Sequence, residues 1–170
     1  MAYDQHITSA KDIRARCAII TLSDTRTLET DKSGQRIRHL LAQENHTVAA
    51  YELLPDDPEK LAAHLDTLLT RPDIDVILSS GGTGIARRDQ TVPTIQQRLT
   101  TPLPGFGELF RMLSHQQIGS GAMLSRALGG VADGKLLFAM PGSTNAVDLA
   151  MTQLILPELR HLLFELRKPA

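Results

Sequence analysis

The stretch from Val76 to Asp89 constrains the fold more than any other part of the sequence, because it joins an apolar run to a glycine-rich turn. Val76-Ile77-Leu78 is followed by two serines and then by Gly81-Gly82-Thr83-Gly84. An apolar run with β-branched residues, stopped by glycines, is typical of a buried parallel strand and the turn at its carboxyl end. The pattern predicts an α/β domain in which this turn lies at the edge of the sheet where ligands bind.

The glycine turn also has the chemistry of a phosphate site. Glycines at 81, 82 and 84 leave the backbone free to take positive φ and to bring its N–H groups close to a ligand. Such N–H groups, with a helix N-terminus beyond them, favour a phosphate. Arg87 and Arg88 add positive charge, and Asp89 offers oxygen ligands to a divalent cation. We therefore expect a phosphate site with a metal carboxylate; a turn without any ligand is the alternative.

Two familiar phosphate loops are excluded. The turn lacks the Gly-Lys-Ser/Thr ending of a P-loop, and Arg87 stands where a dinucleotide fingerprint needs its third glycine. A nucleotide-dependent oxidoreductase is therefore the weakest function considered.

Length and composition favour a single domain. The chain has 170 residues, of which 42% are hydrophobic, and this is enough to bury one core. We find no internal repeat and no linker. We expect a polar N-terminal arm over residues 1–15 and one domain over residues 16–170.

Charge and cysteine content exclude several classes of partner. The net charge is −1, the 18 basic residues are scattered, and aromatic residues are scarce, which argues against nucleic acid. No segment has the length of a membrane span, and the N-terminus shows no apolar signal region. The single cysteine, Cys17, excludes an internal disulfide and fits a reducing compartment. We expect a cytoplasmic protein.

Strand and helix patterns alternate along the chain, which predicts a largely parallel sheet. The predicted strands cover residues 17–22, 47–54, 76–78 and 136–140. Predicted helices begin at the caps Ser33 and Asp57, cover residues 91–98, 106–117 and 123–128, and follow Ser143 or Thr144 to the end, with Pro157 as a kink or restart.

Acidic residues follow several of the predicted strands. Ser23-Asp24, Pro55-Asp56-Asp57, the glycine turn and Pro141-Gly142-Ser143 should meet at the carboxyl edge of the sheet. Asp24, Asp56 and Asp89 are then candidates for one cluster. Carboxylates beside phosphates need a cation between them, because like charges repel. A bridging Mg²⁺ would neutralise the phosphate charge and stabilise a leaving group.

Several of the candidates also have a purely structural interpretation, but Asp56 is harder to explain in this way, because its neighbour already fills the cap. Asp57 is better explained as a helix cap, Asp24 could close an Asx-turn, and Asp89 could cap the helix near Thr91. Ser143 has the position of an N-cap beside the site. Cys17 is interpreted as a core residue. The histidines show no metal-ligand spacing and are predicted to lie on the surface; they are residues 6, 39, 46, 64, 115 and 161.

With these motifs placed, the chain resembles the MoaB/MogA family of molybdenum cofactor biosynthesis proteins. The likeness covers most of the chain in family order, and residues 106–114 and 138–144 resemble the MoaB branch most. It is carried by Thr21-Leu22-Ser23-Asp24, Ser79-Ser80-Gly81-Gly82-Thr83-Gly84 with Arg88-Asp89, Pro104-Gly105-Phe106-Gly107-Glu108, Leu124-Ser125-Arg126 and Met140-Pro141-Gly142-Ser143-Thr144.

The resemblance implies a three-layer α/β/α domain with a mostly parallel sheet, assembled as a trimer or hexamer. It implies Mg²⁺-dependent adenylylation of molybdopterin by ATP with release of pyrophosphate. Asp56 and Asp89 carry over as the catalytic, metal-binding residues. The residues that would bind the pterin and the nucleotide are Ser23, Asp24, Gly81, Gly82, Thr83, Gly84, Arg88, Ser114, Ser125, Pro141, Gly142 and Ser143.

The sequence departs from the family pattern at two points. Val92 separates Thr91 from Pro93, where the family commonly runs Arg-Asp-x-Thr-Pro, and Pro-Gly-Ser-Thr replaces the Pro-Gly-x-Pro of MogA-type enzymes. The alternative to the enzyme is a non-catalytic protein of the same pathway that binds the pterin or hands it to other molybdenum cofactor biosynthesis proteins.

Overall fold

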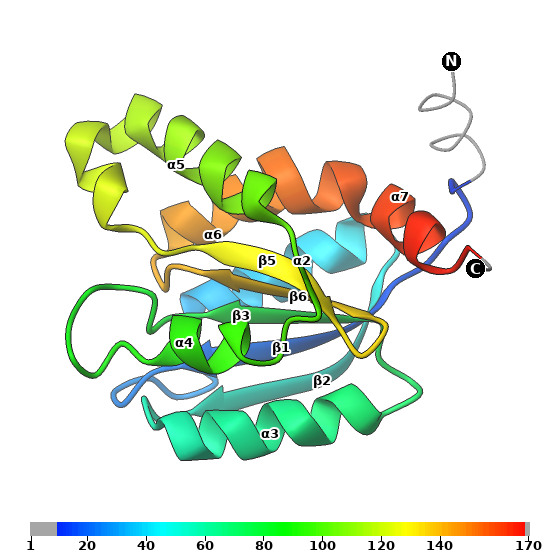
Figure 1. The fold of residues 1–170 in the computed structure, drawn as a ribbon, viewed down its shortest axis with the longest axis horizontal. Coiled ribbons are helices and arrows are strands. Elements are labelled where there is room, and N and C mark those ends of the chain that lie inside the picture. The colour runs from blue at the N-terminus through cyan, green and yellow to red at the C-terminus, as the bar shows by residue number, and fades with distance from the viewer. Residues whose placement is uncertain (1–9, 169–170) are drawn as a thin grey trace.

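One mixed sheet organises the molecule, a computed structural model that describes residues 10–168 (Figure 1). The sheet has six strands within these residues, in the order β2-β1-β3-β6-β5-β4. The first four are parallel, and β5 and β4 pair antiparallel at one edge. The strands are β1 (Arg16–Leu22), β2 (Thr47–Leu54), β3 (Val76–Ser80), β4 (Thr101–Pro102), β5 (Leu128–Ala132) and β6 (Lys135–Met140).

Helices cover both faces of the sheet, so the predicted three-layer α/β/α fold is confirmed. Alternate residues of β1 point to opposite faces, as the period of a strand requires. Cys17 and Ile19 belong to one apolar core, whereas Ala18, Ile20 and Leu22 belong to the other. The first core lies under α2 (Lys32–Gln43), α5 (Pro104–Ile118), α6 (Thr144–Ala150) and α7 (Leu156–Leu166), the second under α3 (Pro58–Thr70) and α4 (Thr91–Gln96).

Most predicted helix boundaries are confirmed. Asp57 caps α3 by accepting hydrogen bonds from two backbone N–H groups, and Pro58 takes the first position. Ser143 caps α6. The terminal helical region is interrupted by the π-helix η2 (Met151–Ile155) and restarts as α7, with Pro157 in its first turn.

The predicted cap of α2 is wrong. Asp31, not Ser33, accepts the hydrogen bond from the Gly34 N–H. The Ser33 hydroxyl instead donates to the carbonyl of Gly142, a residue far away in sequence. A tertiary contact has therefore replaced the local one.

The predicted helix at residues 123–128 is also wrong. The chain forms the 3-10 helix η1 (Gly119–Leu124) and then strand β5, which contains Gly129 and Gly130. These glycines lack a side chain because nothing else fits: a Cβ on Gly129 would lie 2.5 Å from Cδ1 of Phe138. The aromatic ring on the next strand supplies the packing instead.

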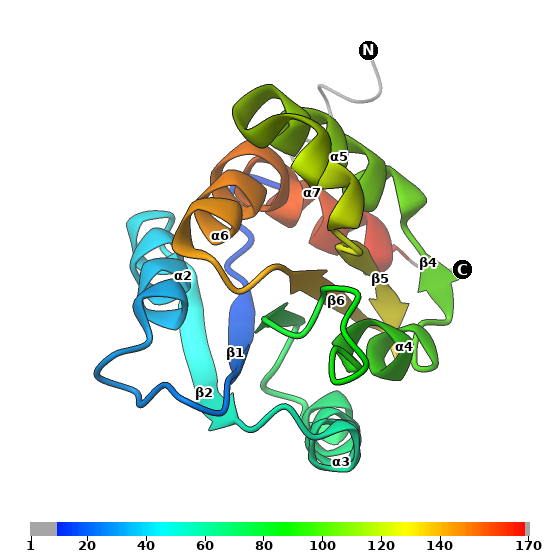
Figure 2. The ribbon, with the colours of Figure 1, turned by 90° about the vertical axis from the view of Figure 1, so that its left-hand side faces the viewer.

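Carboxyl ends of the four parallel strands share one edge of the sheet, the edge that faces the viewer in Figure 2. The loops after β1, β2, β3 and β6 therefore emerge together, as the sequence predicted. At this edge the glycine turn runs from β3 toward α4.

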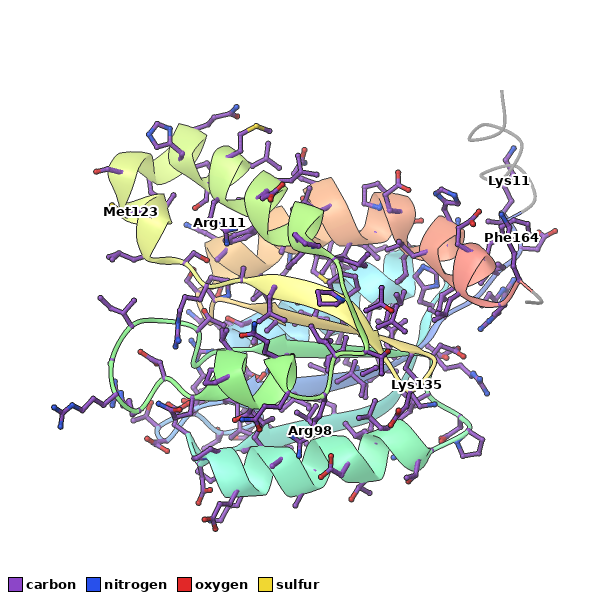
Figure 3. All side chains as sticks on the ribbon, in the orientation of Figure 1. Lys11, Arg98, Arg111, Met123, Lys135 and Phe164 are labelled. Carbon is purple, nitrogen blue, oxygen red and sulfur yellow. The ribbon has the colours of Figure 1, made fainter. Side chains whose placement is uncertain are left out.

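The opposite edge, at the amino ends of the strands, is closed by ion pairs. Asp75 precedes β3 and is bound by two arginines: Arg16 Nη2 lies 2.8 Å and Arg167 Nη2 3.0 Å from its Oδ1. Lys135 Nζ, at the start of β6 (Figure 3), donates to the carbonyls of Arg71 and Ile74 at 2.8 Å each. Within residues 10–168 no helix combines the length and the apolarity that crossing a bilayer requires.

The structure describes only residues 10–15 of the predicted N-terminal arm, because residues 1–9 lie outside the described residues. Ala10 and Ala15 are fully buried, and the Ala15 N–H donates to Nδ1 of His46 at 3.0 Å. His46 is only 5% exposed, so its predicted surface position is wrong. Cys17 is a core residue, as predicted, and burial raises the pKa of its thiol to about 12.

Candidate functional site

A cleft of about 320 Å³ opens at the carboxyl edge of the sheet. Pockets of this size are typical of small-ligand sites. Its walls come from the glycine turn, α5, η1 and the loop after β6. Nine of the predicted site residues line it: Gly82, Thr83, Gly84, Asp89, Ser114, Ser125, Pro141, Gly142 and Ser143.

The glycine turn needs its glycines for both conformation and space. Gly81 and Gly82 have φ of 101° and 63°, which confirms the predicted positive φ at these two positions. A Cβ on Gly81 would lie 2.4 Å from the carbonyl oxygen of Leu22, and one on Gly82 would lie 2.1 Å from Oγ1 of Thr91. The backbone of the turn therefore lies directly on β1 and on the start of α4.

The loop after β6 forms the adjoining wall. The carbonyl of Gly142 accepts hydrogen bonds from Arg26 Nη2 at 3.0 Å and from Ser33 Oγ at 2.8 Å. A Cβ on Gly142 would lie 3.2 Å from Cα of Gly81, so the two loops touch through their backbones. Ser143 Oγ accepts from the Ala146 N–H at 3.2 Å. The loop after β1, helix α2 and the glycine turn therefore all hold this wall in place.

Behind this wall lies a buried aspartate that sequence reasoning did not select as part of the site. Asp31 has no exposed surface and accepts from Tyr51 Oη at 2.7 Å and from the Gly34 N–H at 3.1 Å, with Arg26 Nη1 at 3.4 Å. Burial alone would raise its pKa, but hydrogen bonds from Thr21, Tyr51 and Gly34, with the charge of Arg26, hold it below the ordinary value. Asp31 thus orients Arg26 toward Gly142.

Asp56 lines a narrow hollow next to the cleft, together with Arg88 and Thr91. Gly82 lies between the two spaces, because a Cβ built on it would be 3.3 Å from Oδ1 of Asp56. The pKa of Asp56 is raised, first by burial and then by the charges of Asp24 and Asp89, against the opposing effect of Arg88. The three predicted aspartates therefore lie within electrostatic reach of one another.

Asp89 does not cap α4. The N-cap is Gln90, which makes no side-chain capping bond, and Asp89 Oδ2 accepts from the Ala86 N–H at 2.9 Å. The helix behind the turn has only six residues, so the turn's own backbone rather than a long helix faces the cleft.

Arg126 is a further residue that sequence reasoning did not place in the site. Its Nη2 donates to the carbonyl of Asp89 at 2.5 Å, and its backbone N–H donates to the carbonyl of Thr83 at 3.4 Å. Its Nε is buried and has no partner within the described residues. The Leu124-Ser125-Arg126 motif was the signal that could have identified it. Arg126 ties the glycine turn to the wall that follows η1.

Ser23, Asp24 and Gly81 lie beside the cleft rather than in its lining. Ser23 Oγ accepts from the backbone N–H groups of Thr25 and Arg26 at 3.3 and 3.2 Å, which shapes the loop after β1. Asp24 Oδ1 accepts from the Asp56 N–H at 3.0 Å, a contact across two loops rather than an Asx-turn. Asp24 therefore positions the loop that carries Asp56.

The donor set fits a metal shared with a substrate rather than a metal held by protein alone. Within residues 10–168 no three His, Cys, Asp or Glu side chains are grouped to hold an ion. Mg²⁺ is usually bound by one or two carboxylates, with water and phosphate oxygens completing the octahedron. Asp56 lies beside Gly82 and Asp89 beside Gly84, so the glycine turn has a carboxylate at two of its glycines, which suits that mode.

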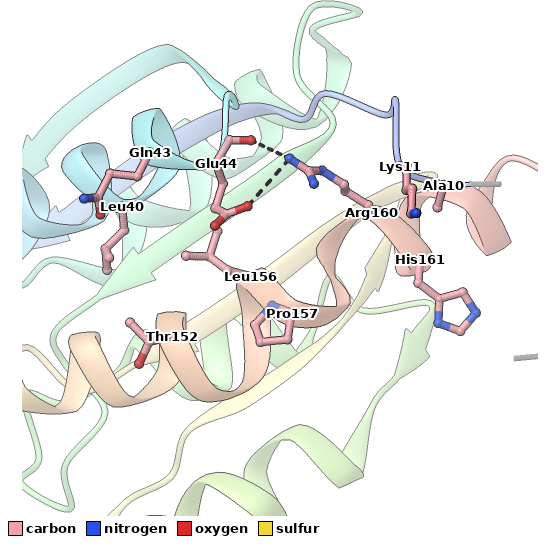
Figure 4. Close-up of a pocket in the computed structure, with 10 residues that line it drawn as sticks. All are labelled: Ala10, Lys11, Leu40, Gln43, Glu44, Thr152, Leu156, Pro157, Arg160 and His161. Carbon is pink, nitrogen blue, oxygen red and sulfur yellow. Dashed lines mark hydrogen bonds and ion pairs between the residues drawn. The ribbon is translucent and has the colours of Figure 1, made fainter. Parts of the chain in front are cut away.

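Another hollow, of about 340 Å³, lies between α2, η2 and α7 (Figure 4). It includes no residue of the glycine turn or of the loop after β6. Its arginine, Arg160, donates to the Glu44 carbonyl at 2.6 Å and lies 3.7 Å from the Glu44 carboxylate. None of the residues that line it belongs to the predicted site. We therefore take the cleft beside the glycine turn as the candidate site.

Comparison with known proteins identifies the family of the chain. The family model described as "Probable molybdopterin binding domain" matches residues 18–161. The chain belongs to this family, in its MoaB/MogA form. The chain is 53% identical over 154 residues to molybdenum cofactor biosynthesis protein B of Bacillus anthracis, covering 90% of this chain and 91% of that one. It is 50% identical over 169 residues to the protein of the same name from Halalkalibacterium halodurans, covering 99% of each.

Solved structures show the same fold. A crystal structure of a molybdenum cofactor biosynthesis protein B matches with a TM-score of 0.90 and 50% identity, covering 92% of this chain and 98% of that chain. The tungsten cofactor synthesizing protein MoaB from Pyrococcus furiosus matches with a TM-score of 0.82 and 32% identity, covering 91% and 98%. The chain is thus a molybdenum cofactor biosynthesis protein of the MoaB/MogA type.

Proposed function

We propose that the cleft binds molybdopterin and Mg-ATP and that the protein adenylylates molybdopterin. The observation that carries this proposal is the convergence of nine predicted residues, from segments spread over the chain, on one cleft of ligand size. Asp56 lies directly beside that cleft. Family membership supplies the substrate class, and the glycine turn supplies a surface suited to phosphate.

In the proposed reaction a terminal phosphate oxygen of the pterin attacks the α-phosphorus of ATP. The bond from that phosphorus to the bridging oxygen breaks, and pyrophosphate leaves with the electron pair. Gly82, Thr83 and Gly84 bind phosphate through the turn, and Arg88 supplies a positive charge beside it. Asp56 and Asp89 hold Mg²⁺, which, when bound, neutralises phosphate charge and stabilises the leaving group.

The raised pKa of Asp56 supports this assignment. A carboxylate that is partly buried among other carboxylates carries an electrostatic cost, and a bound cation removes that cost. An acidic group whose pKa is perturbed by burial and by specific charges beside a cleft is a candidate functional residue. The rest of the cleft is lined by hydroxyl side chains at Ser114 and Ser125 and by exposed apolar side chains at Ile118 and Leu124, which suits a polar heterocycle such as a pterin.

We further propose that the protein assembles as a homo-oligomer, a trimer or a hexamer, and exchanges the pterin with other proteins of the pathway. One observation favours a second function, a non-catalytic protein that binds or hands over the pterin. Asp56 lines a separate hollow of only about 10 Å³ instead of the cleft itself. A protein that only holds the pterin would not need Asp56 to reach a nucleotide.

The deciding experiment measures pyrophosphate release when the protein is mixed with molybdopterin and Mg-ATP. We expect turnover by the natural chain and a roughly 10³-fold loss in Asp89→Asn, about 4 kcal/mol of transition-state stabilisation. Asp133→Asn, which changes an aspartate in the turn between β5 and β6, serves as the matched control and should turn over normally.

Absence of product from the folded natural chain would reject the enzyme. Calorimetric titration with molybdopterin alone then separates the alternatives. Pterin binding that is indifferent to ATP and to Asp89→Asn would establish the hand-over protein.

A further inference from the structure

One loop beside the cleft is tied to a distant part of the chain by Arg126. The loop comprises residues 83–90, runs from the glycine turn to the start of α4, and projects at the left of Figure 1. The side chains of residues 85–88 are exposed. Apart from bonds to the first turn of α4, which continues the chain, both hydrogen bonds that leave the loop within residues 10–168 come from Arg126.

Arg126 binds this loop near both of its ends. Its backbone N–H donates to the carbonyl of Thr83 at 3.4 Å, and its Nη2 donates to the carbonyl of Asp89 at 2.5 Å. Between these points the loop bonds to itself, because the Ala86 N–H donates to Oδ2 of Asp89 and the Asp89 N–H donates to the Ala86 carbonyl, both at 2.9 Å. The carboxylate of Asp89 is thus fixed to the backbone of the loop, and the position of the loop sets the position of the carboxylate.

The segment that carries Arg126 is held from another side by Arg111 of α5 (Figure 3). Nη1 of Arg111 lies 3.5 and 3.4 Å from the carbonyl oxygens of Ser125 and Ala127, the residues immediately before and after Arg126. The Ala127 N–H also donates to Oγ of Ser125 at 3.3 Å. The wall after η1 therefore has contacts of its own that do not involve the Arg126 side chain, whereas the Asp89 end of the loop depends on that side chain.

We infer that Arg126 is a positioning residue for the phosphate half of the cleft, the half formed by the glycine turn. Its guanidinium holds the Asp89 end of the loop, and through the loop it holds the carboxylate that is proposed to bind Mg²⁺. A charged donor makes a stronger hydrogen bond than a neutral one, so the bond to Asp89 is a large part of what fixes the loop. The inference rests on the proposed function for the identity of the ligand, but the effect on the loop is measured without any ligand.

The first test is limited digestion of the free protein with trypsin. Arg87 and Arg88 are exposed cleavage sites inside the loop, so the rate of cleavage after them, followed by mass spectrometry, reports how often the loop opens. Arg126→Met keeps the backbone N–H but loses the bond to Asp89, and cleavage in the loop should become about tenfold faster. An unchanged rate in folded Arg126→Met, with folding checked by circular dichroism, would overturn the inference.

Arg160→Met is the matched control for this digestion. Nη2 of Arg160 also donates to a backbone carbonyl, that of Glu44 at 2.6 Å, and its Nε, like that of Arg126, is buried without a hydrogen-bond partner within the described residues. Arg160 lines the hollow of Figure 4, which includes no residue of the loop. The control should leave the rate of cleavage in the loop unchanged. Equal acceleration in both variants would mean that Arg126 only contributes to general stability.

The second test is calorimetric titration with Mg-ATP and, separately, with molybdopterin. Arg126→Met should weaken Mg-ATP binding about tenfold, because the carboxylate of Asp89 is no longer held in place. Molybdopterin binding should stay unchanged, because Arg111 still contacts the wall after η1. Arg126→Lys, whose ammonium group can still donate to the Asp89 carbonyl, should restore part of the affinity for Mg-ATP. A purely structural role would weaken both ligands alike.

The two titrations separate failure of this inference from failure of the proposed function. A natural chain that binds no Mg-ATP rejects the proposed function, and the digestion rates then decide whether Arg126 holds the loop. A natural chain and an Arg126→Met variant that bind Mg-ATP equally well reject the positioning role alone.

Discussion

At the amino ends of the strands Asp75 lies between two arginines, whereas at the carboxyl ends Asp56 faces two other aspartates. Hydrogen bonds and charges from Arg16, with the charge of Arg167, overcome the effect of burial and lower the pKa of Asp75 to about 2. The pKa of Asp56 is raised, first by burial and then by Asp24 and Asp89. One sheet thus carries a carboxylate that neighbouring arginines neutralise and a carboxylate that the fold leaves among like charges.

This contrast separates stability from function within a single domain. Charged side chains that a fold does not neutralise lower its stability. Such side chains are expected at functional sites, where a ligand of opposite charge can neutralise them. The two edges can therefore be altered independently, and substitutions at each should have opposite consequences.

The largest effect is expected from Asp56→Asn. Turnover should fall about 10³-fold, since the variant lacks one of the two carboxylates proposed to hold Mg²⁺. Without Mg²⁺ the free energy of unfolding should rise by roughly 0.5 kcal/mol, because a like-charge repulsion disappears. Pyrophosphate release and urea denaturation measure the two quantities on the same sample. A variant that loses stability together with activity would show that Asp56 supports the fold.

The reverse result is expected from Asp75→Asn. The pKa of Asp75 is about 2 in the folded chain and about 4 in the unfolded chain. The stability that the ionised carboxylate contributes is therefore fully present above about pH 4 and is lost as the pH falls toward about 2. The substitution should cost about 2 kcal/mol of unfolding free energy and leave turnover unchanged. Asp73→Asn, an exposed neighbour paired with Arg71, is the control and should cost much less.

The smallest effect concerns His46, which lies near the amino edge. Burial, with the nearby charge of Arg160, lowers its pKa, so the unfolded chain binds the proton more readily than the folded one. Stability should therefore fall by roughly 1 kcal/mol as pH drops from 7 through the unfolded pKa of about 6.5 toward 5.5. Urea titrations at several pH values measure this slope. His46→Gln should flatten it, whereas exposed His39→Gln should not.

Sequence reasoning was accurate where local rules decide the structure. The strand before the glycine turn, the cap at Asp57 and the restart at Pro157 all follow from periodicity and capping preferences, and each is confirmed. It failed where distant residues decide. No strand was predicted over residues 128–132, where two adjacent glycines stand. There β5 pairs antiparallel with β6, and the ring of Phe138 fills the space that a side chain at Gly129 would take.

The site divides in the same way. Residues that follow strands were placed at the correct edge because topology brings such loops together. Arg126 and Asp31 were not selected. Arg126 acts through a hydrogen bond to the backbone of a distant loop, which only the Leu124-Ser125-Arg126 motif could have suggested. Asp31 acts through Arg26, and no spacing in the sequence links the two to Gly142. Whether Asp56 and Asp89 hold a metal stays a prediction for the variants above.

The buried thiol of Cys17 on β1 is a natural chemical probe of how often the core of the protein opens. Only a thiolate reacts with an alkylating reagent, and a pKa of about 12 with no accessible surface leaves Cys17 inert in the closed molecule. Alkylation must then wait until the helices that cover this face of the sheet move away from β1. The labelling rate of the unaltered chain, followed by mass spectrometry, therefore reports how often its centre comes apart.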